Sequence, residues 1–484
     1  MYELENKQVL VIGLGARGRA ACELLRGSGA NVMAVDEADT EELRAEAGRL
    51  RPLGVEVELG ATVAPNRQFS LAVVSPAVPG NTAMVLEMRQ RKVPLIGEFE
   101  LGFQQAKCLS IAVAGTNGKG TTAELIEHLL AHNHRKIELC GHGSRPVCSV
   151  ALETKELDFL VLQVNSFQLE TTQFFRPAVA VLMNLAPDHL DRYASHADYV
   201  RANARLFQNQ QPFDWAIVQS EALAQLRSLD LPMPSKVITF SANNRRADIY
   251  MERGLIMSRL PDWSWPLLNL DECQLQGSHN AENLMAALAV GHVLRLPLDA
   301  MVSVLKAERP GPHRFERVAE LNGVQFINDS KATNVDALQK ALLSLPGTGG
   351  EPNVWLIAGG KDKGLEYYDV GPLLSQRVKG AFLIGEAREK IRAAWSLFTP
   401  CTAVSSLLEA VSVAAKNAVS GDVILFSPAC SSFDQFRNYQ HRGEVFRQAV
   451  NELTTPTRSG SVESHPNAPA VNTDKLQSIE TKNK

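Results

Sequence analysis

The stretch over residues 111–122, IAVAGTNGKGTT, constrains the fold of this chain more than any other part of the sequence. Its apolar start predicts a buried strand that stops at Gly115 and turns into a helix opening near Lys119. Glycines allow successive backbone N–H groups to face one anion, while the helix N-terminus and the lysine add positive charge. The stretch therefore predicts a phosphate-binding loop whose ligand is a nucleotide triphosphate.

The residues after the loop lysine depart from the usual pattern, GxxxxGK[ST], in which a hydroxyl follows the lysine directly and holds Mg²⁺. Gly120 takes that position here, and the first hydroxyls belong to Thr121 and Thr122. One of these two threonines therefore has to serve any bound ion.

The length of 484 residues predicts about three domains. A formal net charge of −4 gives no general attraction to nucleic acid or to an anionic membrane, so we expect small-molecule partners. The N-terminus, MYELENKQ, lacks an apolar core segment, and no run of about 18 apolar residues occurs, which predicts a cytoplasmic protein. The seven scattered cysteines are never spaced CxxC and are expected to be reduced core thiols.

A second glycine-rich turn, GLGARG at residues 13–18, lies between an apolar run and a helical stretch, and a further apolar run ends at Asp36. Strand, GxGxxG, helix, strand and acid form the dinucleotide fingerprint, in which the acid binds a ribose hydroxyl. Three interpretations stay open: a dehydrogenase site, a site for another nucleotide-bearing ligand, and a tight turn that binds nothing. A strand over 71–74 then runs into Ser75, and we place the first domain boundary near residue 95.

The central unit, residues 96–308, contains two apolar runs typical of parallel strands that are buried on both faces, at 157–164 and 179–182. Ligands of open α/β sheets bind beyond the carboxyl ends of such strands, where the phosphate loop also lies. The polar residues at these strand ends are Gln163, Asn165, Asp188, His189 and Asp191. The last three are candidates for holding a metal ion; the alternative is a helix N-terminus with a capping aspartate and an exposed histidine.

Residues 276–290 predict a helix with Ser278 as its cap. Asn280 and Asn283 share one face of this helix. They either contact a nucleobase edge or are solvated. A Pro-Gly-Pro break follows, and we place the second boundary after residue 308.

The third unit, residues 309–455, again alternates strands and helices, and polar residues follow each strand, which predicts a second binding wall. The expected strands are 324–328, 354–358, 381–384 and 423–426. Residues 456–484 are rich in Thr, Pro, Ser, Asn and Lys and are expected to form a disordered tail.

Seven motifs occur in one order along the chain: GTNGKGTT, NLAPDHLDR, HNAEN, GPHRF, NDSKATN, AGGKDKG and SPACSSFDQF. In these the chain resembles the Mur ligase family, ATP-dependent amide-bond-forming enzymes of peptidoglycan synthesis that also include the folylpolyglutamate synthases. The resemblance implies an α/β fold of three domains: a Rossmann-like N-terminal domain, a central P-loop NTPase-like domain with a parallel sheet, and a Rossmann-like C-terminal domain. The chain is most similar to members that add D-glutamate to UDP-N-acetylmuramoyl-L-alanine, in which the first domain binds the UDP end of the substrate instead of NAD.

The resemblance also implies a reaction, its cofactors and its partners. ATP phosphorylates the substrate carboxylate to give an acyl phosphate, which the amine of D-glutamate then attacks. The implied cofactors are ATP and Mg²⁺, the partners are the UDP-linked muramoyl precursor and D-glutamate, and the protein is expected to act as a monomer.

Site residues follow by resemblance, position by position. The catalytic residues are Lys119, His189, Lys331 and Lys363. The ATP-binding residues are Gly115, Thr116, Asn117, Gly118, Lys119, Gly120, Thr121, Thr122, Asn280, Asn283, Arg314 and Asp329. The substrate-binding residues are Gly15, Ala16, Asp36, Ser75, Thr333, Ser432, Phe433 and Tyr439. The metal ligands are Thr121, Gln163 and His189.

Four positions near the implied reaction centre depart from the family pattern. Gln163 replaces a metal-binding glutamate, and Asn203 replaces a lysine that the family carbamylates. Gly120 replaces the hydroxyl after the loop lysine, and GHGS around His142 replaces GNIG. Because hard divalent cations depend on anionic oxygens, these losses predict weaker binding of a second Mg²⁺.

Two classes of function therefore stay open. The first is an active ligase with one well-held Mg²⁺, in which Asp188 or Asp191 compensates for the lost anions. The second is a ligase-like binding or regulatory protein with weak catalysis. The retained lysines and Arg314 favour the active ligase. A folylpolyglutamate synthase is the alternative within the ligase class, and a dehydrogenase would leave the phosphate loop unexplained.

Overall fold

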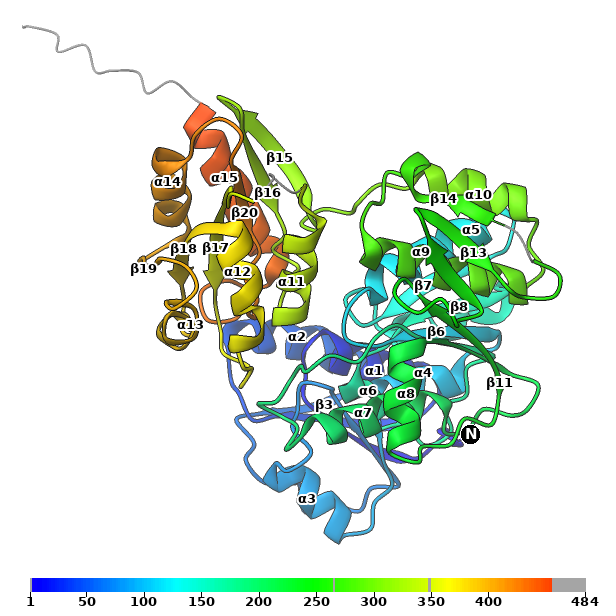
Figure 1. The fold of residues 1–484 in the computed structure, drawn as a ribbon. Helices are drawn as coiled ribbons and strands as arrows, with labels where there is room; N and C mark the ends of the chain where they lie inside the picture. The colour runs from blue at the N-terminus through cyan, green and yellow to red at the C-terminus, as the bar shows by residue number, and fades with distance from the viewer. Residues whose placement is uncertain (1, 264–265, 347–349, 455–484) are drawn as a thin grey trace, which may run out of the picture.

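The computed structural model describes residues 2–263, 266–346 and 350–454. Its strands form three sheets, of five, nine and six strands, which follow one another along the chain. In Figure 1 the third sheet and its helices, olive to orange, lie opposite the central sheet, and one segment between α10 and β15 joins the two parts. The predicted α/β fold class is therefore confirmed. The boundaries near residues 95 and 308 remain predictions, and the tail over 456–484 lies outside the described residues.

The first sheet is parallel throughout, in the order β3-β2-β1-β4-β5. Its strands are β1 (Gln8–Ile12), β2 (Asn31–Asp36), β3 (Glu56–Leu59), β4 (Leu71–Val74) and β5 (Leu95–Gly97). The helices of this part are α1 (Ala16–Gly27), α2 (Glu41–Leu50), α3 (Ala83–Gln90) and α4 (Glu98–Gln105). The strand order reverses between β1 and β4, so the glycine-rich turn after β1 lies at a topological switch point.

The central sheet has the order β14-β13-β12-β11-β10-β9-β6-β8-β7, and its strands from β7 to β12 pair in parallel. Its strands are β6 (Leu109–Ala114), β7 (Ile137–Gly141), β8 (Phe159–Gln163), β9 (Val179–Leu182), β10 (Trp215–Gln219), β11 (Lys236–Ser241), β12 (Ile249–Glu252), β13 (Leu255–Ser258) and β14 (Pro266–Asn269). The helices are α5 (Lys119–His132), α6 (Ser166–Leu169), α7 (His196–Ala204), α8 (Ser220–Ser228), α9 (Ser278–Val293) and α10 (Leu298–Ala307). Because β6 lies between β8 and β9, the loop after β6 is level with the ends of both neighbours.

The third sheet has the order β15-β16-β20-β17-β18-β19, and only the pairing of β15 with β16 is antiparallel in this sheet as described. Its strands are β15 (Glu316–Leu321), β16 (Val324–Asn328), β17 (Val354–Gly359), β18 (Val378–Ile384), β19 (Cys401–Ala403) and β20 (Val423–Phe426). The helices are α11 (Val335–Ser344), α12 (Gly371–Arg377), α13 (Arg388–Trp395), α14 (Leu407–Asn417) and α15 (Tyr439–Thr454).

One helix cap differs from the prediction. Ser278 is the first residue of α9 instead of its cap, and Gly277 holds the cap position with φ 90° and ψ 157°. Glycine adopts this positive φ without strain, so it terminates the preceding loop and the serine side chain makes no capping hydrogen bond.

All seven cysteines lie in the described residues and none forms a disulfide. Five are buried, whereas Cys108, just before β6, and Cys401, at the start of β19, are partly exposed. Among the helices that the structure describes, none is long and apolar enough to cross a membrane.

Candidate active site

The predicted phosphate loop joins β6 to α5, and two of its glycines are required by space as well as by backbone angle. Gly115 has φ 122°, and a Cβ added to it would lie 2.9 Å from the carbonyl oxygen of Asn184. Gly118 has φ 86° and caps α5, and its added Cβ would lie 2.4 Å from Oδ1 of Asn283. The loop therefore packs directly against the residues that follow β9 and against α9.

We expect Gly118→Ala to weaken ATP binding by about tenfold, because the loop has to shift away from Asn283 and the left-handed backbone is strained. Calorimetric titration with ATP measures this change. The matched control is Gly48→Ala, where an added Cβ meets nothing within 4 Å. Equal affinities of the two variants would contradict the prediction.

Lys119 opens α5 and folds back over the loop. Its Nζ donates hydrogen bonds to the carbonyl oxygens of Gly115 at 2.7 Å and Thr116 at 2.8 Å. Burial lowers the pKa of Lys119 to about 8, while the nearby Asp188 carboxylate favours the charged form. The ammonium group therefore lies where the loop would receive phosphate oxygens.

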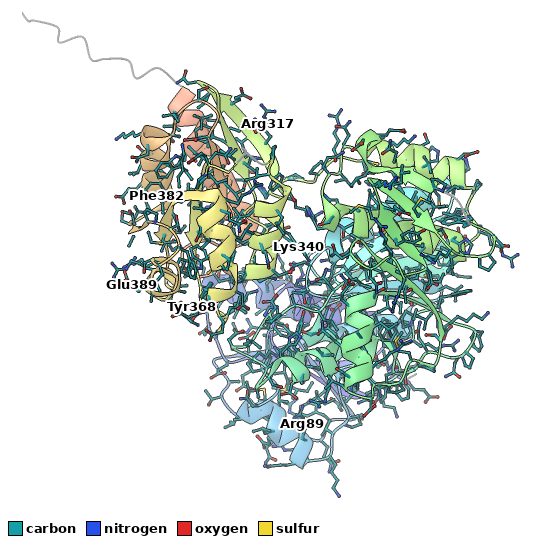
Figure 2. All side chains as sticks on the ribbon, in the orientation of Figure 1. Arg89, Arg317, Lys340, Tyr368, Phe382 and Glu389 are labelled. Atoms are coloured by element: carbon teal, nitrogen blue, oxygen red, sulfur yellow. The ribbon has the colours of Figure 1, made fainter. Side chains whose placement is uncertain are left out.

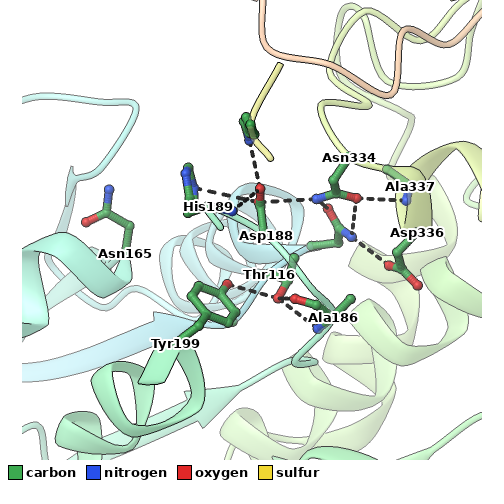
Figure 3. Close-up of polar contacts among 12 residues, drawn as sticks. Thr116, Asn165, Ala186, Asp188, His189, Tyr199, Asn334, Asp336 and Ala337 are labelled. Carbon is green, nitrogen blue, oxygen red and sulfur yellow. Dashed lines mark hydrogen bonds and ion pairs between the residues drawn. The ribbon is translucent and has the colours of Figure 1, made fainter. Parts of the chain in front are cut away.

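Polar groups of the residues that follow β9 form hydrogen bonds with the phosphate loop. The side chain of Asn184 accepts from the backbone N–H of Asn117 at 2.9 Å. The Thr116 hydroxyl contacts the phenol of Tyr199 at 2.9 Å and donates to the carbonyl of Ala186 at 3.1 Å (Figure 3). These bonds fix the loop before any ligand arrives, which preorganises the site.

The third domain reaches this loop through a network of amides and one ion pair (Figure 3). The side chain of Asn117 donates to Asn334 at 3.2 Å and to Asp336 at 2.6 Å. Asn334 in turn donates to Asp188 at 3.3 Å, and Lys363 donates to the other oxygen of Asp188 at 2.9 Å. The central and third domains are therefore held together by polar contacts directly at the phosphate loop.

The ionisation states of Asp188 and its neighbour His189 follow from these contacts. Burial favours the neutral acid, but the Lys363 ammonium, which also donates a hydrogen bond, outweighs it together with Lys119, so the pKa of Asp188 lies below its usual value. Burial, together with Lys363 and Lys119, lowers the pKa of His189 to about 4, although Asp188 opposes this. The His189 imidazole is therefore neutral at pH 7 and has the lone pair that a metal ligand needs.

The cavity wall opposite the phosphate loop includes three residues of the third domain: Asp329, Lys331 and Tyr439. Lys331 places its Nζ 4.0 Å from the ring centroid of Tyr439, and burial, with Arg314 and Lys119 nearby, lowers its pKa to about 7. Asp329 accepts hydrogen bonds from Ser427 and from the backbone N–H of Phe315, both at 3.0 Å. Burial nevertheless raises the pKa of Asp329 to about 7.

This raised pKa predicts a pH-dependent stability. Below about pH 4 Asp329 is protonated in both the folded and the unfolded chain, whereas between 4 and 7 only the folded chain retains the proton. The stability that this group contributes is therefore lost as pH rises toward 7. In Asp329→Asn the amide oxygen can accept from the N–H of Phe315 while the amide NH2 donates to the hydroxyl of Ser427. We expect this variant to match the wild-type free energy of unfolding near pH 4 and to exceed it by up to a few kcal/mol above pH 7. Denaturant unfolding across this pH range tests it, and a constant difference would contradict it.

The side chains along the cavity fit one of the two implied Mg²⁺ ions. Thr121, Gln163 and the neutral His189 offer oxygen and nitrogen donors along the cavity, a set that suits one Mg²⁺ carried mainly by phosphate oxygens. A second, carbamate-bound ion does not fit. Asn203 is fully buried, donates to the carbonyl of Tyr199 at 2.9 Å, and leaves its Oδ1 without a partner. In the described ranges no three or more His, Cys, Asp or Glu side chains are grouped to hold an ion.

A cavity of about 1320 Å³ lies between the three parts of the chain. Lys340 on α11, labelled in Figure 2, lies on the side of the third domain that faces the central domain and contributes to this cavity. The predicted site residues that line the cavity are Thr116, Asn117, Gly118, Lys119, Gly120, Thr121, Gln163, His189, Asn280, Asn283, Arg314, Asp329, Lys331, Thr333, Lys363, Ser432, Phe433 and Tyr439.

Six predicted residues do not line the cavity: Gly15, Ala16, Asp36, Ser75, Gly115 and Thr122. Asp36 accepts from the backbone N–H of Leu14 at 2.7 Å and so holds the glycine-rich turn of the first domain. The Thr122 hydroxyl is buried and donates to Asn283 at 3.2 Å. The first domain instead contributes Arg17, which donates to the carbonyl of Gly141 at 3.3 Å.

Sequence reasoning missed the structural roles of Asn334 and Glu124. Asn334 lies within the NDSKATN motif and caps α11, so a capping signal was present, but its contact with Asn117 joins residues 217 positions apart. Glu124 on α5 pairs with Arg314, 190 positions away, and no local signal marks it.

The fold and the site define a class of nucleotide-dependent enzyme in which a third α/β domain approaches a phosphate loop. Two family models match: the Mur ligase middle domain over residues 113–291, and the Mur ligase, glutamate ligase domain over 313–430. The chain belongs to the Mur ligase family and is an ATP-dependent amide-bond ligase.

Curated relatives are similar to the chain in sequence, and solved structures are similar to it in fold. The chain is 39% identical to UDP-N-acetylmuramoylalanine--D-glutamate ligase of Acidobacterium capsulatum, over 93% of this chain and 97% of the relative. It is 36% identical to the ligase of the same name from Koribacter versatilis, over 93% and 98%. The UDP-N-acetylmuramate-alanine ligase MurC of Thermotoga maritima has a similar fold, with a TM-score of 0.59 at 18% identity over 93% of this chain and 100% of that one. The MurF ligase of Thermotoga maritima in complex with ADP gives a TM-score of 0.59 at 16% identity, over 94% and 100%.

Proposed function

We propose that this chain joins D-glutamate to UDP-N-acetylmuramoyl-L-alanine with ATP, in the cytoplasm and as a monomer. The observation that carries the proposal is the 39% identity to a ligase of that name over 97% of its length. The site supports it, because the phosphate loop and the third-domain residues Lys331, Thr333 and Ser432 line one cavity. That cavity also receives Arg17 from the first domain, where the UDP end would bind.

The proposed ligation has two steps, phosphoryl transfer to the precursor and attack by the amine of D-glutamate. A carboxylate oxygen of the precursor attacks the γ-phosphorus of ATP, the bond to the β,γ-bridging oxygen breaks, and ADP leaves. Lys119 stabilises the negative charge on the transferring phosphoryl group. The amine of D-glutamate then attacks the acyl carbon, loses a proton and expels phosphate to leave an amide.

Residues of the third domain position the amino acid and exclude water. Lys331 and Lys363 are cations on the cavity wall that suit the two carboxylates of D-glutamate. The contact of Asn334 with Asn117 of the loop and the ion pair of Lys363 with Asp188 hold this wall against the central domain, which protects an acyl phosphate from hydrolysis. Mg²⁺, held by Thr121, Gln163 and His189 together with phosphate, would supply further charge neutralisation when bound.

The test measures phosphate release from ATP with UDP-N-acetylmuramoyl-L-alanine and Mg²⁺, with and without D-glutamate. Release that requires both substrates supports the proposal. Binding of the precursor without release, across a Mg²⁺ titration, would instead identify a ligase-like binding protein, which the uncharged Gln163 and Asn203 favour. Release with a folate and glutamate alone would identify a folylpolyglutamate synthase.

A further inference from the structure

Arg314 is held on the phosphate-loop helix by an acidic residue that the proposed chemistry does not use. Its Nη1 and Nη2 donate to the two carboxylate oxygens of Glu124 at 2.5 and 2.9 Å, and Nη1 also contacts the hydroxyl of Thr121 at 3.2 Å. The pair is bidentate, which fixes the plane of the guanidinium as well as its position. Arg314 comes from the segment that enters the third domain, whereas Glu124 and Thr121 lie on α5 of the central domain.

Gly120 leaves the space that Arg314 occupies. A Cβ added to Gly120 would lie 2.8 Å from Nη2 of Arg314 and 3.5 Å from Oε1 of Gln163. Gly120 is not among the glycines with positive φ, and it is the second residue of α5, so no left-handed backbone conformation requires a glycine there. Backbone conformation therefore does not explain this glycine, but the approach of the guanidinium does.

The residues on either side of Arg314 have strained backbone conformations that hydrogen bonds hold in place. His313 and Phe315, on either side, have φ of 63° and 51°, which non-glycine residues rarely adopt. The N–H of His313 donates to Glu316 at 2.9 Å and that of Phe315 to Asp329 at 3.0 Å, which stabilises both conformations. Such strain persists only where surrounding contacts impose it, typically at functional sites.

Charge explains why an anion is needed beside this arginine. Burial lowers the pKa of Lys331, and Arg314 and Lys119 lower it further, so the three cations that line the cavity lie close enough to repel one another. Glu124 offsets part of this repulsion and leaves other N–H groups of the guanidinium for a ligand.

We propose that Glu124 is a positioning residue that holds Arg314 against the first turn of α5, and that Gly120 admits it. Phosphate groups then meet a guanidinium where the usual loop presents a hydroxyl. The inference rests on the proposed function in one respect: it assigns Arg314 to the phosphates of ATP.

The experiment compares four full-length variants, Glu124→Gln, Glu124→Asp, Gly120→Ala and Gly120→Ser, by calorimetric titration with ATP at several Mg²⁺ concentrations. The Glu124 side chain is 41% exposed, and a side chain at Gly120 would displace only side-chain atoms of Arg314 and no backbone, so all four variants are expected to fold. Thermal unfolding checks this. Titration needs neither precursor nor amino acid, so its result stands even where the ligation assay fails.

We expect Glu124→Gln and both Gly120 variants to weaken ATP binding by about tenfold, and Glu124→Asp to retain part of the affinity. Weakening by Gly120→Ser is the decisive result, because a serine that merely restored the usual hydroxyl would strengthen binding of Mg²⁺ with ATP. Tighter binding by Gly120→Ser with unchanged binding by Gly120→Ala would overturn the proposal. Unchanged affinity in Glu124→Gln would also overturn it.

Discussion

Replacing Lys119 by alanine is expected to lower ATP-dependent phosphate release by about 10³-fold or more, the range seen when a key charge on a transferring phosphoryl group is removed. The physical reason is that Lys119 supplies a full positive charge at the loop, with its Nζ held 2.7 Å from the carbonyl oxygen of Gly115. The backbone N–H groups of the loop remain, so ATP binding should weaken far less than turnover.

The measurement is the initial rate of phosphate release with both substrates present, beside nucleotide titration of the same variant. Lys136→Ala is the matched control, because Lys136 is an exposed lysine of the same domain. Turnover of Lys119→Ala within tenfold of the wild-type rate would exclude a phosphoryl-stabilising role for this lysine.

Lys363→Met is expected to have the second-largest effect, a loss of ligation of at least about 100-fold. Lys363 and Asp188 are both buried and are joined at 2.9 Å across the two domains. Removal of the lysine leaves a buried carboxylate without its main partner, which costs about 3–5 kcal/mol when nothing relaxes. The domains would separate to hydrate Asp188, and the cavity would no longer be closed.

Small-angle scattering of the free protein should show a larger radius of gyration for Lys363→Met, whereas Lys416→Met, an exposed lysine on α14, should not change it. Adding Asp188→Asn to Lys363→Met should restore the compact form without restoring activity, because the buried charge is then gone. A compact and fully active Lys363→Met variant would show that the ion pair is dispensable.

Continuous apolar runs predicted some of the buried strands of each sheet. Val179–Leu182 and Val423–Phe426 occur at the predicted positions. Both strands are buried on both faces, so their sequences are continuously apolar and the first polar residue lies close to the strand end. Ten of the strands that the structure describes were missed: β3, β5, β7, β10, β11, β12, β13, β14, β15 and β19. Glu316–Leu321 is half exposed and pairs on one side with its neighbour β16, so its sequence mixes charged and apolar residues.

The sequence predicted the phosphate loop because glycines, lysine and a following helix are local features. It did not predict what holds the domains together, because those partners are far apart in the chain: Asn117 with Asn334, and Glu124 with Arg314. The motif comparison marked Gly120 as a departure, but only the position of Arg314 shows why glycine is suited there. Contacts between distant residues depend on domain placement, which no local pattern records.

Two of the native cysteines are suitable labelling sites for measuring the distance between the central and third domains. The five buried thiols are shielded from reagents, whereas Cys108 and Cys401 are partly exposed, one in the central part and one in the third. A donor and an acceptor dye attached to these two native thiols would report the separation of the domains by energy transfer in single molecules. Any change in the separation of the domains during turnover is therefore measurable without introducing a new cysteine.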